Sequence, residues 1–335
     1  MAISNVSVLN QYSEYLLPRY SNFPLGRYAS LVIVRKTESE AIFRTEGSGE
    51  GLVKETVMAG MIPAHAKPMR RVVISKRKQT AVERRAGREV LREHGLLKTV
   101  VVNKEERPCS LNTNAPCGKC IDCMLYGYAV GGGGAQKSRV MTEDAYSLGP
   151  VAQVTGRRTF NATFDNSTMR NPLTGEASTS INEDEYVLPE THFLDIETLK
   201  DVTVGELEYV IANVLRSSRY GAISSRMGKM RNILAAIVFS DAEIFSTLEL
   251  TQFVYDHLWG DKDERDFPLP DTAVLQAVHE ATDHLLRQLV SRTPVVVRGE
   301  ALQRIQEETI ALYRDGDNVK AFLEEIEKGY APAAK

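Results

Sequence analysis

Residues 192–239 read HFLDIETLKDVTVGELEYVIANVLRSSRYGAISSRMGKMRNILAAIVF, and this stretch decides the fold. Its two ends, 192–196 and 232–239, are short apolar runs that predict β-strands. Between them, GELEYVIANVLRS places its apolar residues at helical spacing and predicts an amphipathic helix. The stretch therefore predicts a complete β-α-β unit.

A second unit of the same kind lies earlier in the chain. Strand-like runs occur at 30–34 and 99–102, and the segment 80–95, TAVERRAGREVLREHG, predicts a helix that stops at its final glycine. Two further runs, at 71–75 and 151–155, also predict strands. The order β-α-β-β-α-β is that of a ferredoxin-like or RRM-like core.

The rest of the chain divides into insertions in this core and a C-terminal extension. We expect an α+β fold whose core comprises 20–103, 137–156 and 191–240, with a basic insertion at 36–79. Two further insertions are a four-cysteine module at 104–136 and a polar hairpin at 157–190, and insertions of this length are usually functional. After Phe239 the apolar spacing becomes helical, so 241–335 is expected to be a helical part.

The composition is that of a folded globular protein. Of the 335 residues, 43% are hydrophobic and 25% are charged. The N-terminus lacks a secretion signal, and no apolar run approaches the roughly 18 residues that a membrane span needs. We therefore expect a cytoplasmic protein with no membrane contact.

Charge is strongly segregated along the chain. Segment 67–92 carries a net charge of +8 in a protein of net charge −3, whereas 176–208 holds ten acidic residues and one lysine. A second basic run, RSSRYGAISSRMGKMR at 216–231, combines arginines with Tyr220 and glycines. Such runs bind phosphates and stack on unpaired bases, although an isolated basic run is more often a solvated helix face. Two runs favour a nucleic-acid binder, and the separate acidic segment favours self-association.

All four cysteines lie in the run CSLNTNAPCGKCIDC. Cys109, Cys117, Cys120 and Cys123 are spaced C-x7-C-x2-C-x2-C, with turns at Pro116 and Gly118, which suits structural zinc. An iron–sulfur cluster is the alternative, but Gly127 stands where a bacterial ferredoxin has its fourth cysteine. Disulfides are disfavoured in a cytosolic chain. A site closed by four thiolates would stabilise a loop and leave no position for catalysis.

Common catalytic motifs are absent from the sequence. GSGEGL at 47–52 lacks the last glycine of a dinucleotide fingerprint, no Walker A loop occurs, and neither G-x-S-x-G nor H-E-x-x-H is present. The six histidines are scattered. A non-catalytic role is therefore favoured over an enzymatic one.

The combination of these parts resembles one family. The parts are a core of RRM type with a basic insertion, a four-cysteine loop, a polar hairpin, the run RYGAISSRMGKMRN leading into a strand, and a helical C-terminal part. Together they are similar to the RNA-binding backbone subunit of type I-D CRISPR effector complexes, in the Cas-seven family of the RAMP superfamily. The resemblance covers residues from about 20 to 300. It implies a subunit that polymerises along CRISPR guide RNA (crRNA) and whose hairpin, the thumb, reaches over the RNA of its neighbour.

The resemblance also implies partners and contacts. The partners would be crRNA, a target DNA or RNA strand, further copies of the chain and other CRISPR effector subunits, with zinc as the cofactor. The expected RNA contacts are Lys67, Arg70, Arg71, Lys76, Arg77, Lys78, Arg84, Arg85, Arg157, Arg158, Arg219, Tyr220, Arg226, Lys229 and Arg231.

Two alternatives to the scaffold hypothesis remain. Related backbone subunits cut target RNA with an aspartate in the loop after an early strand, but residues 36–66 here contain five glutamates and no aspartate. The alternative of a backbone nuclease cutting target RNA or single-stranded DNA therefore rests on those glutamates. A zinc-ribbon transcription or translation factor would need a basic cysteine loop, yet Lys119 is opposed by Asp122.

Overall fold

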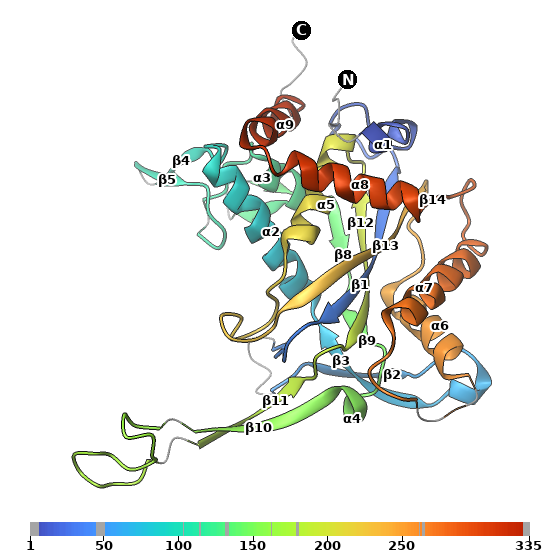
Figure 1. The fold of residues 1–335 in the computed structure, drawn as a ribbon. Coiled ribbons are helices and arrows are strands. Elements are labelled where there is room, and N and C mark those ends of the chain that lie inside the picture. The colour runs from blue at the N-terminus through green and yellow to red at the C-terminus, as the bar shows by residue number, and fades with distance from the viewer. Residues whose placement is uncertain are drawn as a thin grey trace.

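The structure is a computed structural model that describes residues 7–44, 51–102, 104–113, 115–130, 134–161, 163–178, 181–260, 262 and 265–330. An antiparallel sheet of eight strands forms its centre, in the order β14-β13-β1-β12-β9-β3-β2, with β8 also paired to β12 (Figure 1). The strands are β1 Tyr28–Thr37, β2 Lys54–Met58, β3 Pro68–Ile74, β8 Val140–Thr142, β9 Ala145–Ser147, β12 His192–Lys200, β13 Met230–Ser240 and β14 Val295–Val297.

The predicted α+β core of ferredoxin type is confirmed. β1, β12 and β13 are the first, third and fourth core strands, with α2, Lys76–Glu93, after β1 and α5, Val204–Arg216, between β12 and β13. Helix α5 begins with a capping box in which Thr203 and Glu206 satisfy each other's backbone N–H groups.

The second core strand differs from the prediction. The run 99–102 forms β4, Thr99–Val102, but β4 pairs with β5, Glu105–Pro108, in a hairpin separate from the central sheet. Val101 is 71% exposed, and Val100 and Val102 on the opposite face are only half-buried, so no residue of this strand lies in the core. Strands β8 and β9, which pair with β12, take the expected place.

The strand predicted at 151–155 is wrong. Residues Val151–Val154 form the short helix α4, and a strand begins only at Thr155. The amides of Gln153 and Val154 both donate to the carbonyl of Pro150, which closes a helical turn that apolar periodicity alone does not reveal.

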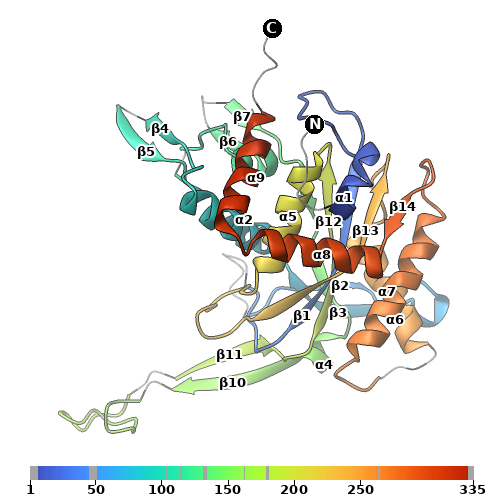
Figure 2. The same cartoon turned by 45° about the horizontal axis from the view of Figure 1, so that its top comes forward.

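Helices cover both faces of the sheet, because strand side chains alternate between the faces (Figure 2). Leu31 and Ile33 pack in one apolar cluster with α2, α5, α8 (Glu300–Leu312) and α9 (Gly316–Lys328). Val32 and Val34 pack in a second cluster with α6 (Thr247–Trp259) and α7 (Asp271–Leu286). The remaining short elements are α1 Ser7–Asn10, η1 Ser13–Tyr15, η2 Pro63–His65, α3 Ile121–Tyr126, β6 Tyr128–Val130 and β7 Gly134–Gln136.

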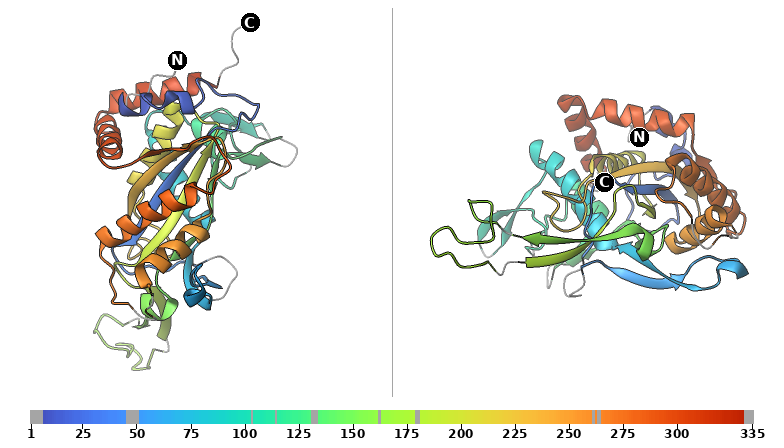
Figure 3. Two further views of the ribbon diagram at one scale, coloured as in Figure 1. Left: turned by 90° about the vertical axis from the view of Figure 1, so that its right-hand side faces the viewer. Right: turned by 60° about the horizontal axis from the view of Figure 1, so that its bottom comes forward.

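A two-stranded hairpin projects from the body, as the sequence predicts. It consists of β10, Thr155–Asn161, and β11, Ile181–Val187, which pair in an antiparallel register (Figure 1; Figure 3). We call residues 155–187 the thumb hairpin. In the part of the chain that the structure describes, no helix is long and apolar enough to cross a membrane.

Candidate nucleic-acid interface and metal centre

Three segments distant in sequence meet at the base of the thumb hairpin. Ala41 forms a β-bridge with Val187, and the amide of Ala222 donates to the carbonyl of Ile42 at 2.8 Å. The loop of residues 217–229, which we call the palm loop, therefore lies beside the early segment 38–43 and the thumb base. Figures 1 and 2 place the palm loop between α2 and the thumb hairpin.

Gly221 allows the palm loop to lie close to the backbone of the early segment 38–43. Gly221 has φ +86°, and a Cβ built there would lie 2.4 Å from the carbonyl oxygen of Ile42. A side chain at this position would push the palm loop away from the early segment.

An open groove of about 610 Å³ lies where the three segments meet. Arg158 comes from the thumb hairpin and Arg226 from the palm loop, so two cations line it from different segments. The remaining lining residues are Ser39, Glu40, Asp184, Pro189, Ile223 and Met227.

The arginines of the thumb base make exposed ion pairs. Arg158 contacts Glu40 at 2.5 Å and lies over the ring of Tyr186, while Arg157 is 3.9 Å from Glu183. Their side chains are 51% and 76% exposed, and such pairs contribute little to stability. A phosphate can therefore replace these carboxylates at small cost.

The other predicted RNA contacts lie in several places. Arg219, Arg226 and Lys229 are exposed on or beside the palm loop, and Lys76, Arg77 and Arg85 are exposed on α2, with Lys78 half-buried. Lys67 and Arg70 are exposed on the β2–β3 hairpin, which extends away from the thumb hairpin (Figure 1; Figure 3). The structure thus brings the palm-loop and thumb-base residues together but does not bring the β2–β3 pair to them.

Two predicted contacts lie inside the protein. Arg71 is 0% exposed, and its guanidinium donates to the backbone oxygens of Ser147, Leu148 and Ala59. Burial lowers the pKa of Arg71 to about 10, so it stays charged at neutral pH. From β3 it holds the ends of β2 and β9 together. A direct contact between Arg71 and RNA phosphates is therefore inconsistent with the structure.

Tyr220 requires the same correction. Its ring is 0% exposed, and its hydroxyl accepts from Arg35 Nη1 at 2.9 Å and lies 3.2 Å from Glu83 Oε1. The tyrosine therefore cannot stack on a base. It anchors the palm loop to the core instead.

A buried ionic cluster, which the sequence did not predict, lies beneath Tyr220. Arg35 on β1 is fully buried and donates to Asp195 and Glu83 at 2.8 Å each. Glu197 lies on the same strand as Asp195, and burial raises its pKa well above the usual range, reinforced by the nearby Glu83 carboxylate. The available signal was charge within runs that are otherwise apolar, at Arg35 and in HFLDIETL.

Two further predicted contacts are engaged by carboxylates. Arg84 donates to both oxygens of the buried Asp122 at 2.9 Å, so its guanidinium is committed to that residue. Arg231 is 51% exposed and lies 2.7 Å from Asp271, which also contacts Lys36 and His192. Burial lowers the pKa of His192, which favours its neutral form.

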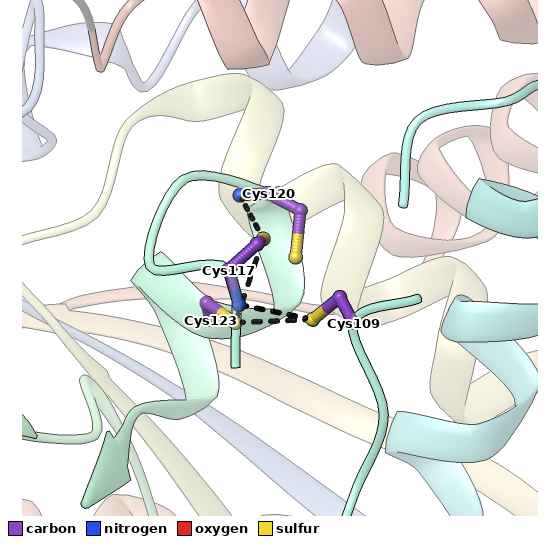
Figure 4. A group of neighbouring side chains, drawn as sticks. All are labelled: Cys109, Cys117, Cys120 and Cys123. Atoms are coloured by element: carbon purple, nitrogen blue, oxygen red, sulfur yellow. Dashed lines mark hydrogen bonds between the residues drawn. The ribbon is translucent and has the colours of Figure 1, made fainter. Parts of the chain in front are cut away.

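The four cysteines converge at the start of α3 (Figure 4). Their sulfur atoms all lie within 4.8 Å of one another, and Cys123 Sγ lies 3.6 Å from Cys109 Sγ and 3.9 Å from Cys117 Sγ. A tetrahedral zinc ion with bonds of about 2.3 Å needs sulfur atoms about 3.8 Å apart.

Backbone amides also point at the sulfurs. The amide of Cys117 donates to Cys109 Sγ and the amide of Cys120 donates to Cys117 Sγ, each at 3.3 Å. Such bonds stabilise thiolates, the form that binds metal. The cysteines therefore fit a structural zinc ion, which would be held by all four sulfurs and would serve to fix the loop.

Comparison with known proteins identifies the family. A family model described as "Csc2 Crispr" matches residues 15–323, nearly the whole chain. The chain belongs to the Csc2 family. The crystal structure of Thermofilum pendens Csc2 has 19% sequence identity and a TM-score of 0.60, and the match covers 97% of each chain. This Csc2 protein therefore shares its fold with the chain, including the mixed α+β architecture.

Two other solved structures are more distant from this Csc2-family chain. A "CRISPR RNA-guided surveillance complex, pre-nicking" has 10% identity and a TM-score of 0.49, covering 85% of this chain and 99% of its own. A "CRISPR RNA-guided surveillance complex" has the same identity and TM-score over 84% and 99%. No curated protein matches the chain.

The zinc assignment in this Csc2-family chain predicts the result of a double substitution. Changing Cys117 and Cys120 to Ser should release about one zinc ion per chain, because two of four thiolate ligands are lost. Inductively coupled plasma mass spectrometry on purified protein measures the metal. A wild-type protein that contains iron, or no metal, would contradict the assignment.

Proposed function

We propose that the chain is the crRNA-binding backbone subunit of a type I-D CRISPR effector complex, a Cas-seven protein that polymerises along crRNA and presents the guide for target pairing. Membership in the Csc2 family supports the CRISPR role. The observation that carries RNA binding is the groove at the thumb base, where Arg158 and Arg226 come from separate segments and Lys229 is exposed nearby.

The groove suits the backbone of a single strand better than its bases. The cations that line it are Arg158 and Arg226, whose guanidinium groups suit phosphates, and the aromatic ring expected to stack, Tyr220, is buried. The protein would therefore read backbone and shape while base pairing reads sequence, the division of labour that RNA-guided effectors use. Exposed Lys76, Arg77 and Arg85 on α2 would extend this surface.

The same proposal names the partners of the chain and the role of its metal. Further copies of the chain, other effector subunits and a target strand would be its partners, and the complex would act in the cytoplasm. Zinc in the four-cysteine module would have a structural role.

A scaffold is favoured over a nuclease by the positions of the early glutamates. Glu40 is paired with Arg158, and Glu38 lies 3.5 Å from Lys229. Within the described ranges, one group of three or more potential metal ligands lies close enough together to share an ion, and it consists of the four cysteines. The described early glutamates therefore belong to no such group, and Glu46 and Glu50 lie outside the described residues.

Removing the cations in and beside the groove tests the proposal. Changing Arg158, Arg226 and Lys229 to Ala should weaken binding to every RNA sequence by roughly tenfold or more, because phosphate contacts carry no base information. The negative slope of log K against log salt concentration should become shallower by about 2, because about three phosphate contacts are lost. Fluorescence anisotropy with two unrelated RNAs over a salt series measures both quantities.

The matched control removes the same charge elsewhere. Arg304, Arg314 and Lys320 are exposed in the α8–α9 region, and changing them to Ala should leave both affinity and slope nearly unchanged. Equal losses in the two triple variants would show that net charge, and not the groove, determines binding.

A further inference from the structure

The metal centre has a neighbour whose role the cysteine spacing does not reveal. Helix α2 carries Arg84 and Arg88 one turn apart, and both face the start of α3. Arg88 is 3% exposed, and its Nη1 donates to Cys109 Sγ at 3.8 Å. Its Nη2 donates to the backbone oxygen of the same cysteine.

Asp122 fixes the orientation of Arg88. It lies between Cys120 and Cys123 in sequence, is 0% exposed, and its Oδ2 accepts from Arg88 Nη1 at 2.6 Å. Arg84 occupies the same carboxylate from the next turn of the helix, through Nε and Nη2 at 2.9 Å each. The guanidinium of Arg88 is thus held by two residues, Asp122 and the expected metal ligand Cys109.

Charge explains why such a group is needed. Four thiolates and a zinc ion carry a net charge of −2, and Asp122 adds another negative charge in a buried setting. A buried charge is costly unless it is paired and hydrogen-bonded. Arg84 and Arg88 supply the compensating charge, but the described contacts join only Arg88 to a cysteine sulfur.

We propose that Arg88 is the outer-shell hydrogen-bond donor of the metal centre, acting on the Cys109 thiolate, and that Asp122 is the residue that positions it. The inference rests on the proposed zinc occupancy and is independent of RNA binding. Groups of this kind orient and stabilise the ligand, and their loss typically weakens metal binding about 10- to 100-fold.

The test compares two arginines that share one carboxylate. Arg88→Met keeps the length of the side chain but removes its donors, and we expect its Zn²⁺ affinity to fall about 10- to 100-fold. Arg84→Met removes an equal charge and two hydrogen bonds to Asp122, where Arg88→Met removes one, but it leaves the Cys109 contact. Its affinity should therefore stay within about threefold of wild type. Competition with a chromophoric Zn²⁺ chelator measures the affinity.

Two further variants test the geometry. Arg88→Lys keeps the charge but has one nitrogen instead of a fork, so an intermediate loss is expected. If circular dichroism shows that Arg88→Met does not fold, Arg88→Lys replaces it in the affinity measurement. Asp122→Asn should also lower Zn²⁺ affinity, because it weakens the ion pair that holds Arg88 against Cys109.

The outcomes separate this inference from the zinc assignment. A wild-type protein without zinc would overturn the assignment itself. Zinc-containing wild type with unchanged affinity in Arg88→Met, or with equal losses in Arg84→Met and Arg88→Met, would overturn the role of Arg88. The absorption of Co²⁺-substituted protein provides a direct readout, because loss of the Cys109 contact should shift the thiolate-to-metal charge-transfer band in Arg88→Met and not in Arg84→Met.

Discussion

Replacing residues 166–176 with a short Gly-Ser turn is expected to abolish cooperative assembly on long RNA while leaving the subunit folded. This segment forms the tip of the thumb hairpin, far from the sheet (Figure 1; Figure 3). Its described hydrogen bonds stay within the tip, as in Asn171 N to Glu176 O and Ser178 N to Met169 O. Removing the tip therefore breaks no described contact with the core.

Assembly should fail because the proposed work of the thumb lies between subunits. The tip is polar and exposes Leu173 at 94%, so it buries little apolar surface of its own. Short RNA should still bind at the groove, which the variant keeps. Electron microscopy and size-exclusion chromatography with a long guide measure assembly, and filaments of normal length and spacing would show that the thumb assignment is mistaken.

The second large effect is expected at Arg35. Arg35→Met would leave Asp195 and Glu83 buried without their cation, and breaking a buried ion pair in this way typically costs about 3–5 kcal/mol. Urea unfolding monitored by circular dichroism measures the change. Because Arg35 also donates to the hydroxyl of Tyr220, the palm loop should lose its anchor.

Two controls define the origin of that loss. Arg231→Met breaks the exposed pair with Asp271 and should cost less than about 1 kcal/mol. Adding Glu83→Gln and Asp195→Asn to Arg35→Met removes the uncompensated charges and should recover part of the stability. An unfolding free energy in Arg35→Met equal to that of wild type would contradict the assigned role of the cluster.

The sequence predicted what is determined locally. The β-α-β unit at 192–239 was predictable because its strands are largely apolar and the apolar residues of its helix recur at helical spacing. The cysteines were predictable as a site because all four lie in a single short run. The cysteines that meet are near neighbours in the chain, whereas the two strands of the unit, β12 and β13, both pair with the distant β1.

What the sequence could not supply depends on contacts between distant residues. Arg71 looks like a phosphate contact within a basic run, yet two of its acceptors are the carbonyls of Ser147 and Leu148, far along the chain at the end of β9. Likewise, 99–102 has the apolar residues of a strand, but the position beside β12 is taken by β8 and β9. Tyr220 became an anchor because Arg35 lies beneath it.

The nucleic acid that copurifies with the protein tests the central claim most directly. The protein would be expressed in cells that contain the CRISPR array and purified without nuclease, and its bound nucleic acid would be extracted and sequenced. A crRNA-binding backbone subunit predicts short RNAs that share a repeat-derived end, and the groove variant with Arg158, Arg226 and Lys229 changed to Ala should yield much less of them. Random cellular RNA, or no RNA from the wild-type protein, would contradict the account.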